Sequence, residues 1–134
     1  MFNRRTLAAI VGGLGSVALA AQVHAAPVTS TPPLQVDVGS GIICAVTNVG
    51  KKPIEIVHQI VAPSGAVADE GTPTTVEPGA TYSSGGVVAP EINGFVYCRV
   101  PGFSSKKIRV TTCLKTVADI FNGVGRCLDM TTAP

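Results

Sequence analysis

Apolar and polar residues are arranged along the chain in short runs with the period of β-strands. Residues 34–38 alternate as a half-buried strand does, residues 41–49 are almost continuously apolar, and residues 54–62 are rich in β-branched side chains. Turn residues at 50–53, Gly-Lys-Lys-Pro, separate the last two runs. These two runs therefore predict a β-hairpin.

The pattern continues to the end of the chain. We expect short strands around Val67 and Val76, an irregular strand at 81–89, and strands at 94–100, 106–115 and 124–130. Turn residues fall at 63–65, 77–80 and 101–102, and residues 117–122 could form one helical turn. The sequence thus predicts a single all-β domain over residues 34–134. We expect an immunoglobulin-like or fibronectin-like antiparallel β-sandwich of about seven strands.

The first 25 residues have the pattern of an export signal. Arg4 and Arg5 precede an uncharged apolar run at 6–21, and short side chains precede an expected cut between Ala25 and Ala26. The run is too short and too rich in glycine for a convincing membrane span, so we expect none in the mature chain. The arginine pair resembles a twin-arginine signal, but the remaining residues favour the general secretory route. Residues 26–33 are expected to form a flexible lead with nothing to bury.

Removal of the signal changes the charge of the chain. The 10 Lys and Arg residues lose Arg4 and Arg5, which leaves 8 against 8 Asp and Glu, a formal net charge of zero. A neutral chain lacks the field that attracts nucleic acid, so we expect no nucleic-acid partner. We also expect a periplasmic or secreted protein, because the four cysteines of an exported chain indicate two disulfides.

The alternation of side chains predicts which cysteines pair. Cys44 is in phase with Ile42 and Val46, and Cys98 is in phase with Val96 and Val100, so both should point into the core. By contrast, Cys113 and Cys127 fall on the polar phases of their strands, with the apolar phase of the last strand held by Leu128 and Met130. We therefore predict a Cys44–Cys98 disulfide across the core and a Cys113–Cys127 disulfide on the outer face.

Three segments together resemble small exported β-sandwich proteins of Gram-negative bacteria. They are CAVTNVGKKPIEIVHQIV, EPGATY, and YCRV followed by KKIRVTTCL, which cover most of residues 44–128. The shared motifs are turn and core residues, so the resemblance implies a fold and a location and no activity. A looser similarity to immunoglobulin domains lacks their buried tryptophan, and Tyr97 stands one residue before Cys98 instead of two.

The sequence contains no complete catalytic or metal-binding set. His58 is the only histidine after residue 25, and its phase with Ile54, Ile56 and Ile60 favours a partly buried, locally hydrogen-bonded side chain. Adjacent carboxylates such as Asp69 and Glu70 have the setting of solvated loop charges. We expect no enzyme, no metal and no cofactor. A cleft that joined His58 to Ser83 or Glu91 would favour a hydrolase instead.

Two surfaces are candidates for binding. If the strands at 94–100 and 106–115 pair, their polar phases form one basic face with an aromatic ring, made of Tyr97, Arg99, Lys107 and Arg109. Such a face could bind an anionic glycan or an envelope protein, although solvated charges are also ordinary on an exposed sheet. The second candidate is the glycine-rich loop 81–93.

We therefore expect an exported, non-enzymatic binding or structural module. A small hydrolase or inhibitor and a subunit that assembles by strand addition remain alternatives.

Overall fold

The computed structural model describes residues 25–37, 40–84, 87–88, 93–116, 118–119, 127 and 129–134, with the backbone alone described at 87, 88 and 129. The apolar part of the expected export signal lies outside these residues, whereas Ala25 and Ala26 are exposed and precede the first strand. The described residues form the following twelve strands: β1 (Val28–Ser30), β2 (Leu34–Val36), β3 (Ser40–Asn48), β4 (Ile54–Ile56), β5 (Gln59–Val61), β6 (Val67–Glu70), β7 (Thr74–Val76), β8 (Thr81–Ser83), β9 (Val87–Val88), β10 (Gly94–Pro101), β11 (Ile108–Thr116) and β12 (Asp129–Thr132).

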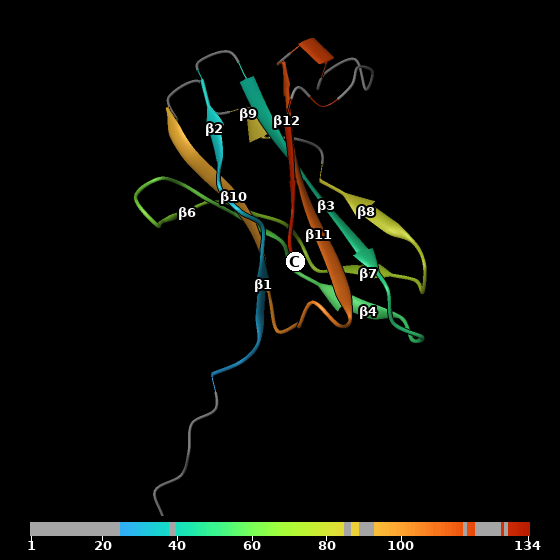
Figure 1. Ribbon diagram of the computed structural model, residues 1–134. Helices are drawn as coiled ribbons and strands as arrows, with labels where there is room; N and C mark the ends of the chain where they lie inside the picture. Colours follow the sequence, from blue (N-terminus) through green and yellow to red (C-terminus); the bar gives the residue numbers. More distant parts are fainter. Residues whose placement is uncertain are drawn as a thin grey trace, which may run out of the picture.

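The strands form antiparallel sheets that pack in a sandwich-like arrangement (Figure 1). One sheet has the order β1-β10-β5-β6, with β2 also paired to β10. A second sheet has the order β12-β11-β3-β8, with β9 also paired to β3. Strands β4 and β7 form a separate two-stranded ladder. The all-β, antiparallel class predicted from the sequence is therefore confirmed. The strands of the described residues are shorter and more numerous than expected.

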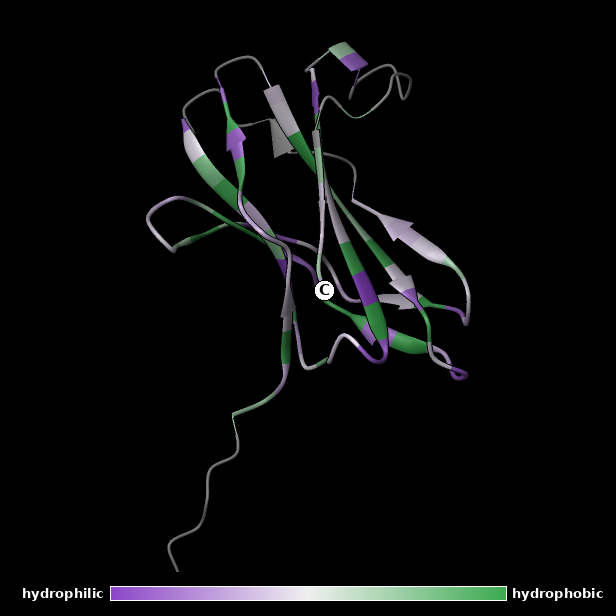
Figure 2. Cartoon of the chain, viewed as in Figure 1, coloured by the Kyte–Doolittle hydropathy of each residue, from purple (hydrophilic) through white to green (hydrophobic). Residues whose placement is uncertain are grey.

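The longest ladder joins β3 to β11. Its register runs from Asn48 opposite Ile108 to Ser40 opposite Thr116 without interruption. On the inner side of this ladder lie Ile42, Cys44 and Val46 from β3, which are all buried. The corresponding side of β10 carries Val96, Cys98 and Val100. The alternation of apolar residues in the sequence thus identified the sides by which the two sheets face each other. Figure 2 colours the hydrophobic residues of these strands green.

Both disulfides form as predicted. Cys44 and Cys98 join β3 to β10 across the core, with their Cα atoms 5.9 Å apart. Cys113 and Cys127 are joined on the other side of β11, with a Cα separation of 5.3 Å. Two disulfides are consistent with an oxidising location. By the chain-entropy account, closing loops of 54 and 14 residues contributes about 4 and about 3 kcal/mol.

The hairpin predicted from residues 41–62 is wrong. Strand β3 pairs with β11, β8 and β9, and the run at 54–62 is divided into two strands. Strand β4 pairs with β7, whereas β5 pairs with β10 and β6. The chain leaves one ladder and enters another at Val57 and His58, which lie outside the strands. Alternation survives this crossing because Ile56, His58 and Ile60 are all buried, so the sequence pattern hides the break.

The flexible lead predicted at 26–33 is also wrong. Residues Val28–Ser30 form β1, which is paired to the end of β10. Thr29 and Thr31 are buried, and each hydroxyl has a partner: Thr29 Oγ1 donates to the Phe103 carbonyl at 2.8 Å, and Thr31 Oγ1 lies 2.7 Å from Thr112 Oγ1. A satisfied hydroxyl can be buried at small cost. The polar composition of residues 26–33 is therefore compatible with a paired and partly buried segment.

The last strand of the described residues is β12 (Asp129–Thr132), and Cys127, which was expected within a strand at 124–130, lies outside it. Met130 lies opposite Cys113 and is 58% exposed, so its expected inward orientation is wrong. Ala133 is buried in its place, and its amide donates to the Val110 carbonyl at 2.8 Å. Residues 120–126 and 128 lie outside the described residues.

Candidate functional site

The predicted basic face does not form as one surface. Tyr97 and Arg99 lie on β10, whereas Arg109 lies on β11 and Lys107 directly precedes it. Strands β10 and β11 belong to the two facing sheets, so their outward side chains point away from each other. The prediction assumed that strands consecutive in the sequence pair with one another. Here the connection at 102–107 crosses from one sheet to the other.

The part of the predicted basic face that lies on β10, Tyr97 and Arg99, has neighbouring side chains that the sequence did not place there. Phe95, Tyr97 and Arg99 form one outward row, because the residues between them, Val96 and Cys98, are buried. Phe95 is 60% exposed, which is unusual for a large aromatic side chain. Its phase with Tyr97 and Arg99 was the signal in the sequence that could have added it to the site.

A row of polar side chains crosses this face at Arg99. The register places Ser30 of β1 opposite Arg99, and Arg99 opposite Gln59 of β5. Gln59 is in turn opposite Glu70 of the edge strand β6. The Arg99 Nε donates to Gln59 Oε1 at 2.6 Å, and Gln59 Nε2 donates to Glu70 Oε2. We call Ser30, Arg99, Gln59 and Glu70 the polar ladder. Gln59 links the side chains of Arg99 and Glu70, so the row contains one positive and one negative charge.

An apolar hollow lies beside the polar ladder, at the first half of β10. It has a volume of about 340 Å³ and is lined by Pro33, Ala62, Pro63, Gly65, Gly94, Phe95 and Tyr97. We call it the aromatic hollow. Apart from the hydroxyl group of Tyr97, the side chains that line it are apolar.

The backbone holds the walls of the aromatic hollow in place. In the turn between β5 and β6, the Ala62 amide donates to the Ala66 carbonyl at 2.8 Å, and the Gly65 amide donates back to Ala62 at 2.9 Å. Gly94 has a φ of 136°, and a Cβ at this position would lie 2.9 Å from Pro63 Cγ. Only glycine combines this φ with the close approach of Pro63. Consequently Pro63 is held against the start of β10.

The other half of the predicted face lies on the second sheet. Arg109 is opposite Thr47 and is exposed, and Lys115 borders a hollow of about 480 Å³ further along β11. This hollow is lined by Ile43, Ala45, Ser83, Ser84, Thr111, Cys113, Lys115, Asp119, Cys127 and Met130. The lining of this hollow combines apolar, hydroxyl-bearing and charged side chains. In the described structure they form no hydrogen-bonded row comparable to the polar ladder.

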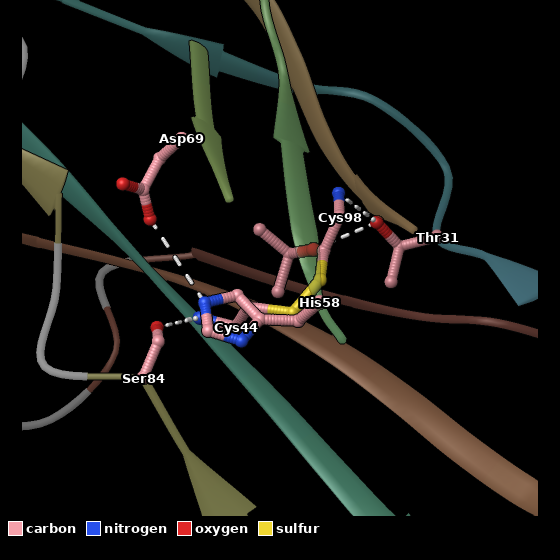
Figure 3. Close-up of a disulfide and its surroundings, with 7 residues drawn as sticks. Thr31, Cys44, His58, Asp69, Ser84 and Cys98 are labelled. Atoms are coloured by element: carbon pink, nitrogen blue, oxygen red, sulfur yellow. Dashed lines mark hydrogen bonds and ion pairs between the residues drawn. A yellow bond between two sulfur atoms is a disulfide. The ribbon is translucent and has the colours of Figure 1, made fainter. Parts of the chain in front are cut away.

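His58 is buried beside the Cys44–Cys98 disulfide (Figure 3). Its Nε2 lies 3.9 Å from Asp69 Oδ2, and its ring centroid is 5.6 Å from that of Tyr82. Burial lowers the pKa of His58 below its ordinary value, and the Asp69 carboxylate opposes this effect. The expectation of a local hydrogen bond is wrong for Nε2, which has no such partner among the described residues.

Among the described residues, no serine or threonine hydroxyl is hydrogen-bonded to His58 Nε2. Ser83 is exposed on β8, and the Ser84 hydroxyl accepts a hydrogen bond from the Cys44 amide at 2.9 Å. Glu91, the other partner considered from the sequence, lies outside the described residues. The described residues also contain no cluster of three or more His, Cys, Asp or Glu side chains that could hold a metal. In the same part of the chain, no helix has the length and apolarity needed to cross a membrane.

Comparison with models of protein families, with curated proteins and with solved structures finds no match to this chain.

Proposed function

We propose that this protein is an exported, non-enzymatic binding module with an immunoglobulin-like or fibronectin-like sandwich, acting in the periplasm or after secretion. The observation that carries the proposal is the outward side of β10. There an exposed phenyl ring and a preorganised polar row lie next to each other on one rigid sheet. Surfaces of this kind are typical of recognition sites, because aromatic side chains supply contact area at little entropic cost.

The rigidity of the sheet supports this role. Strand β10 is paired on both sides, to β1 and β2 and to β5, and Cys98 at its centre is covalently joined to β3. The exposed residues therefore stand on a scaffold that does not have to be ordered when a ligand binds. Preorganisation of this kind lowers the free-energy cost of binding.

The alternatives receive less support. A hydrolase requires a base within reach of a nucleophile, and His58 Nε2 makes no hydrogen bond in the described structure. Strand addition is favoured by a long open edge strand. In the described residues the strands at the ends of the two main sheets are short, namely β1 and β8 with 3 residues each and β6 and β12 with 4 each.

The proposal can be tested by retention on envelope material. The oxidised chain 26–134 is incubated with washed cell-wall and membrane fractions, and the bound protein is measured after sedimentation. We expect retention that falls at least tenfold in Phe95→Ser. The control is Val49→Ser, because Val49 is 46% exposed and lies outside the β10 face. Equal retention of the two variants, or no retention of the parent protein, would contradict the proposal.

A further inference from the structure

We infer that the β10 face binds a neutral saccharide chain, with a sugar ring stacked in the aromatic hollow and its hydroxyl groups on the polar ladder. This inference rests on the proposed binding function and names its ligand class. It replaces the anionic glycan expected from the sequence.

The spacing of the two features limits the chemistry of the ligand. Tyr97 and Arg99 are two residues apart on one strand, a rise of about 6.7 Å. A ligand at this place must therefore offer an apolar surface and hydrogen-bonding groups within the width of a single ring. A sugar ring does so, because its C–H bonds form an apolar face and its hydroxyl groups form the rim.

The apolar half of the surface fits ring stacking. Phe95 has no hydrogen-bonding atom, so its contact with a ligand must be apolar. The hollow beside it is walled by Pro33 and Pro63 and has a volume of about 340 Å³, at the lower end of the range for small-molecule sites. This space suits one or two rings.

The polar half fits hydroxyl groups better than it fits a charged group. Arg99 can only donate hydrogen bonds, ionised Glu70 can only accept them, and Gln59 between them does both. A hydroxyl group both donates and accepts, so a polyol can bind along the whole row. A carboxylate or sulfate can only accept, and it would meet the negative charge of Glu70.

The charge balance of the face leads to the same ligand class. The ladder contains one basic and one acidic side chain, joined through Gln59. The basic side chains that the sequence appeared to add, Lys107 and Arg109, lie on or beside the opposite sheet. Among the residues that line the aromatic hollow or form the polar ladder, no excess positive charge is therefore present to select an acidic polymer.

The test is affinity electrophoresis of the oxidised chain 26–134 in native gels that contain one polysaccharide each. The neutral polymers are a β-1,3-glucan, a β-1,4-linked hydroxyethyl glucan, an α-glucan and a galactomannan. The acidic polymers are alginate and polygalacturonate. We expect retardation by at least one neutral polymer and none by the acidic ones.

Three variants assign that retardation to the β10 face. Phe95→Ala should lower the affinity at least tenfold, and Phe95→Tyr, which keeps the ring, should retain most of it. Glu70→Gln removes the charge that excludes anions and should lower the affinity for the neutral polymer several-fold. Val49→Ser should match the parent protein. Retained disulfides and an unchanged far-ultraviolet circular dichroism spectrum show that each variant is folded.

Two outcomes would overturn the inference. They are retardation by acidic polymers alone, and retardation by no polymer of either kind. If envelope retention still depends on Phe95, the ligand is an acidic polymer in the first case and a protein or a lipid in the second, and the proposed binding function stands. If envelope retention is lost as well, the proposed function fails together with the inference.

Discussion

The backbone amide of Gly71 donates a 2.9 Å hydrogen bond to the His58 carbonyl, and the His58 ring occupies the space that a side chain at position 71 would need. A Cβ built on Gly71 would overlap Cε1 and Nδ1 of the ring. The ring is itself buried and therefore cannot move aside freely. This contact joins the segment after β6 to the crossing between β4 and β5.

We therefore expect Gly71→Ala to destabilise the oxidised protein by about 1–3 kcal/mol, the usual cost of overpacking a core. Urea denaturation gives this value. The double variant His58→Ala, Gly71→Ala is the control, because removal of the ring frees the space. Its loss of stability should be smaller than the sum of the two single losses. Strict additivity would contradict the contact.

His58 also makes the stability depend on pH. Burial lowers its pKa in the folded state below the ordinary value of 6.5 that applies to the unfolded chain. The unfolded state then binds more protons as the pH falls, so folding stability is complete above about 6.5 and decreases as the pH falls below it. Urea denaturation of the chain 26–134 at a series of pH values should show this decrease, and His58→Gln should reduce it.

Asp69→Asn provides a sharper version of the pH experiment. The Asp69 carboxylate raises the pKa of His58 against the effect of burial, so its loss should lower that pKa further. His58 is the only histidine in the chain 26–134, and its ring signals can be followed in a single NMR titration. A pKa that does not change in the variant would show that the 3.9 Å pair is not coupled.

Much of this fold follows from the alternation of side chains. Phase alone separated the core pair Cys44 and Cys98 from Cys113 and Cys127, and both disulfides are present. The second pairing is correct although the expected orientation of Met130 is wrong. Two cysteines in the core leave the remaining two only each other, so the outer pairing did not depend on the register of the last strand.

Strand partners were less predictable than strands. Sequence alternation records which side of a strand is buried, and it contains no information about the neighbouring strand. Residues 54–62 therefore gave no sign that β4 and β5 belong to different sheets. For the same reason Arg99 and Arg109 were assigned to one face. Gln59 and Glu70 could not be added to the site, since only the register of β5 and β6 places them beside Arg99.

Asn48 fixes the end of β3 and should be essential for stability. Its side chain is fully buried and satisfied: Nδ2 donates to the carbonyls of Lys52 and Val76 at 2.8 and 2.9 Å, and Oδ1 accepts from the Gly50 amide at 2.9 Å. Asn48→Asp would place a carboxylate against two carbonyl oxygens. We expect Asn48→Asp to lose at least 3 kcal/mol, roughly the cost of an unpaired buried charge.

Asn48→Ala is the matched variant, because it removes the three bonds without adding charge. We expect it to lose about 2–4 kcal/mol, less than Asn48→Asp at neutral pH. Lowering the pH to 4 should reduce the difference between the two variants as the aspartate becomes protonated. Equal stability of Asn48→Asp and the parent protein in urea denaturation would contradict the role of this side chain.

The two disulfides should differ in their resistance to reduction. Cys44 and Cys98 are fully buried, whereas Cys127 is exposed. Thiol–disulfide exchange requires access of the attacking thiolate to a sulfur atom. Under mild reduction without denaturant, Cys113–Cys127 should therefore open first. Alkylation at timed intervals followed by peptide mass spectrometry checks the order. Earlier alkylation of Cys44 and Cys98 would contradict the buried position of that disulfide.

The pairing of β3 with β11 delays the folding of a chain that emerges with its amino end first. The closest partners in this ladder, Asn48 and Ile108, are 60 residues apart, and β10 must also arrive before β1 has a neighbour. In a chain that emerges with its amino end first, the apolar strand β3 would have only the short strands β8 and β9 as partners until the last third had followed. Such a segment is prone to aggregate, so the emerging chain would depend on a holding chaperone for that interval.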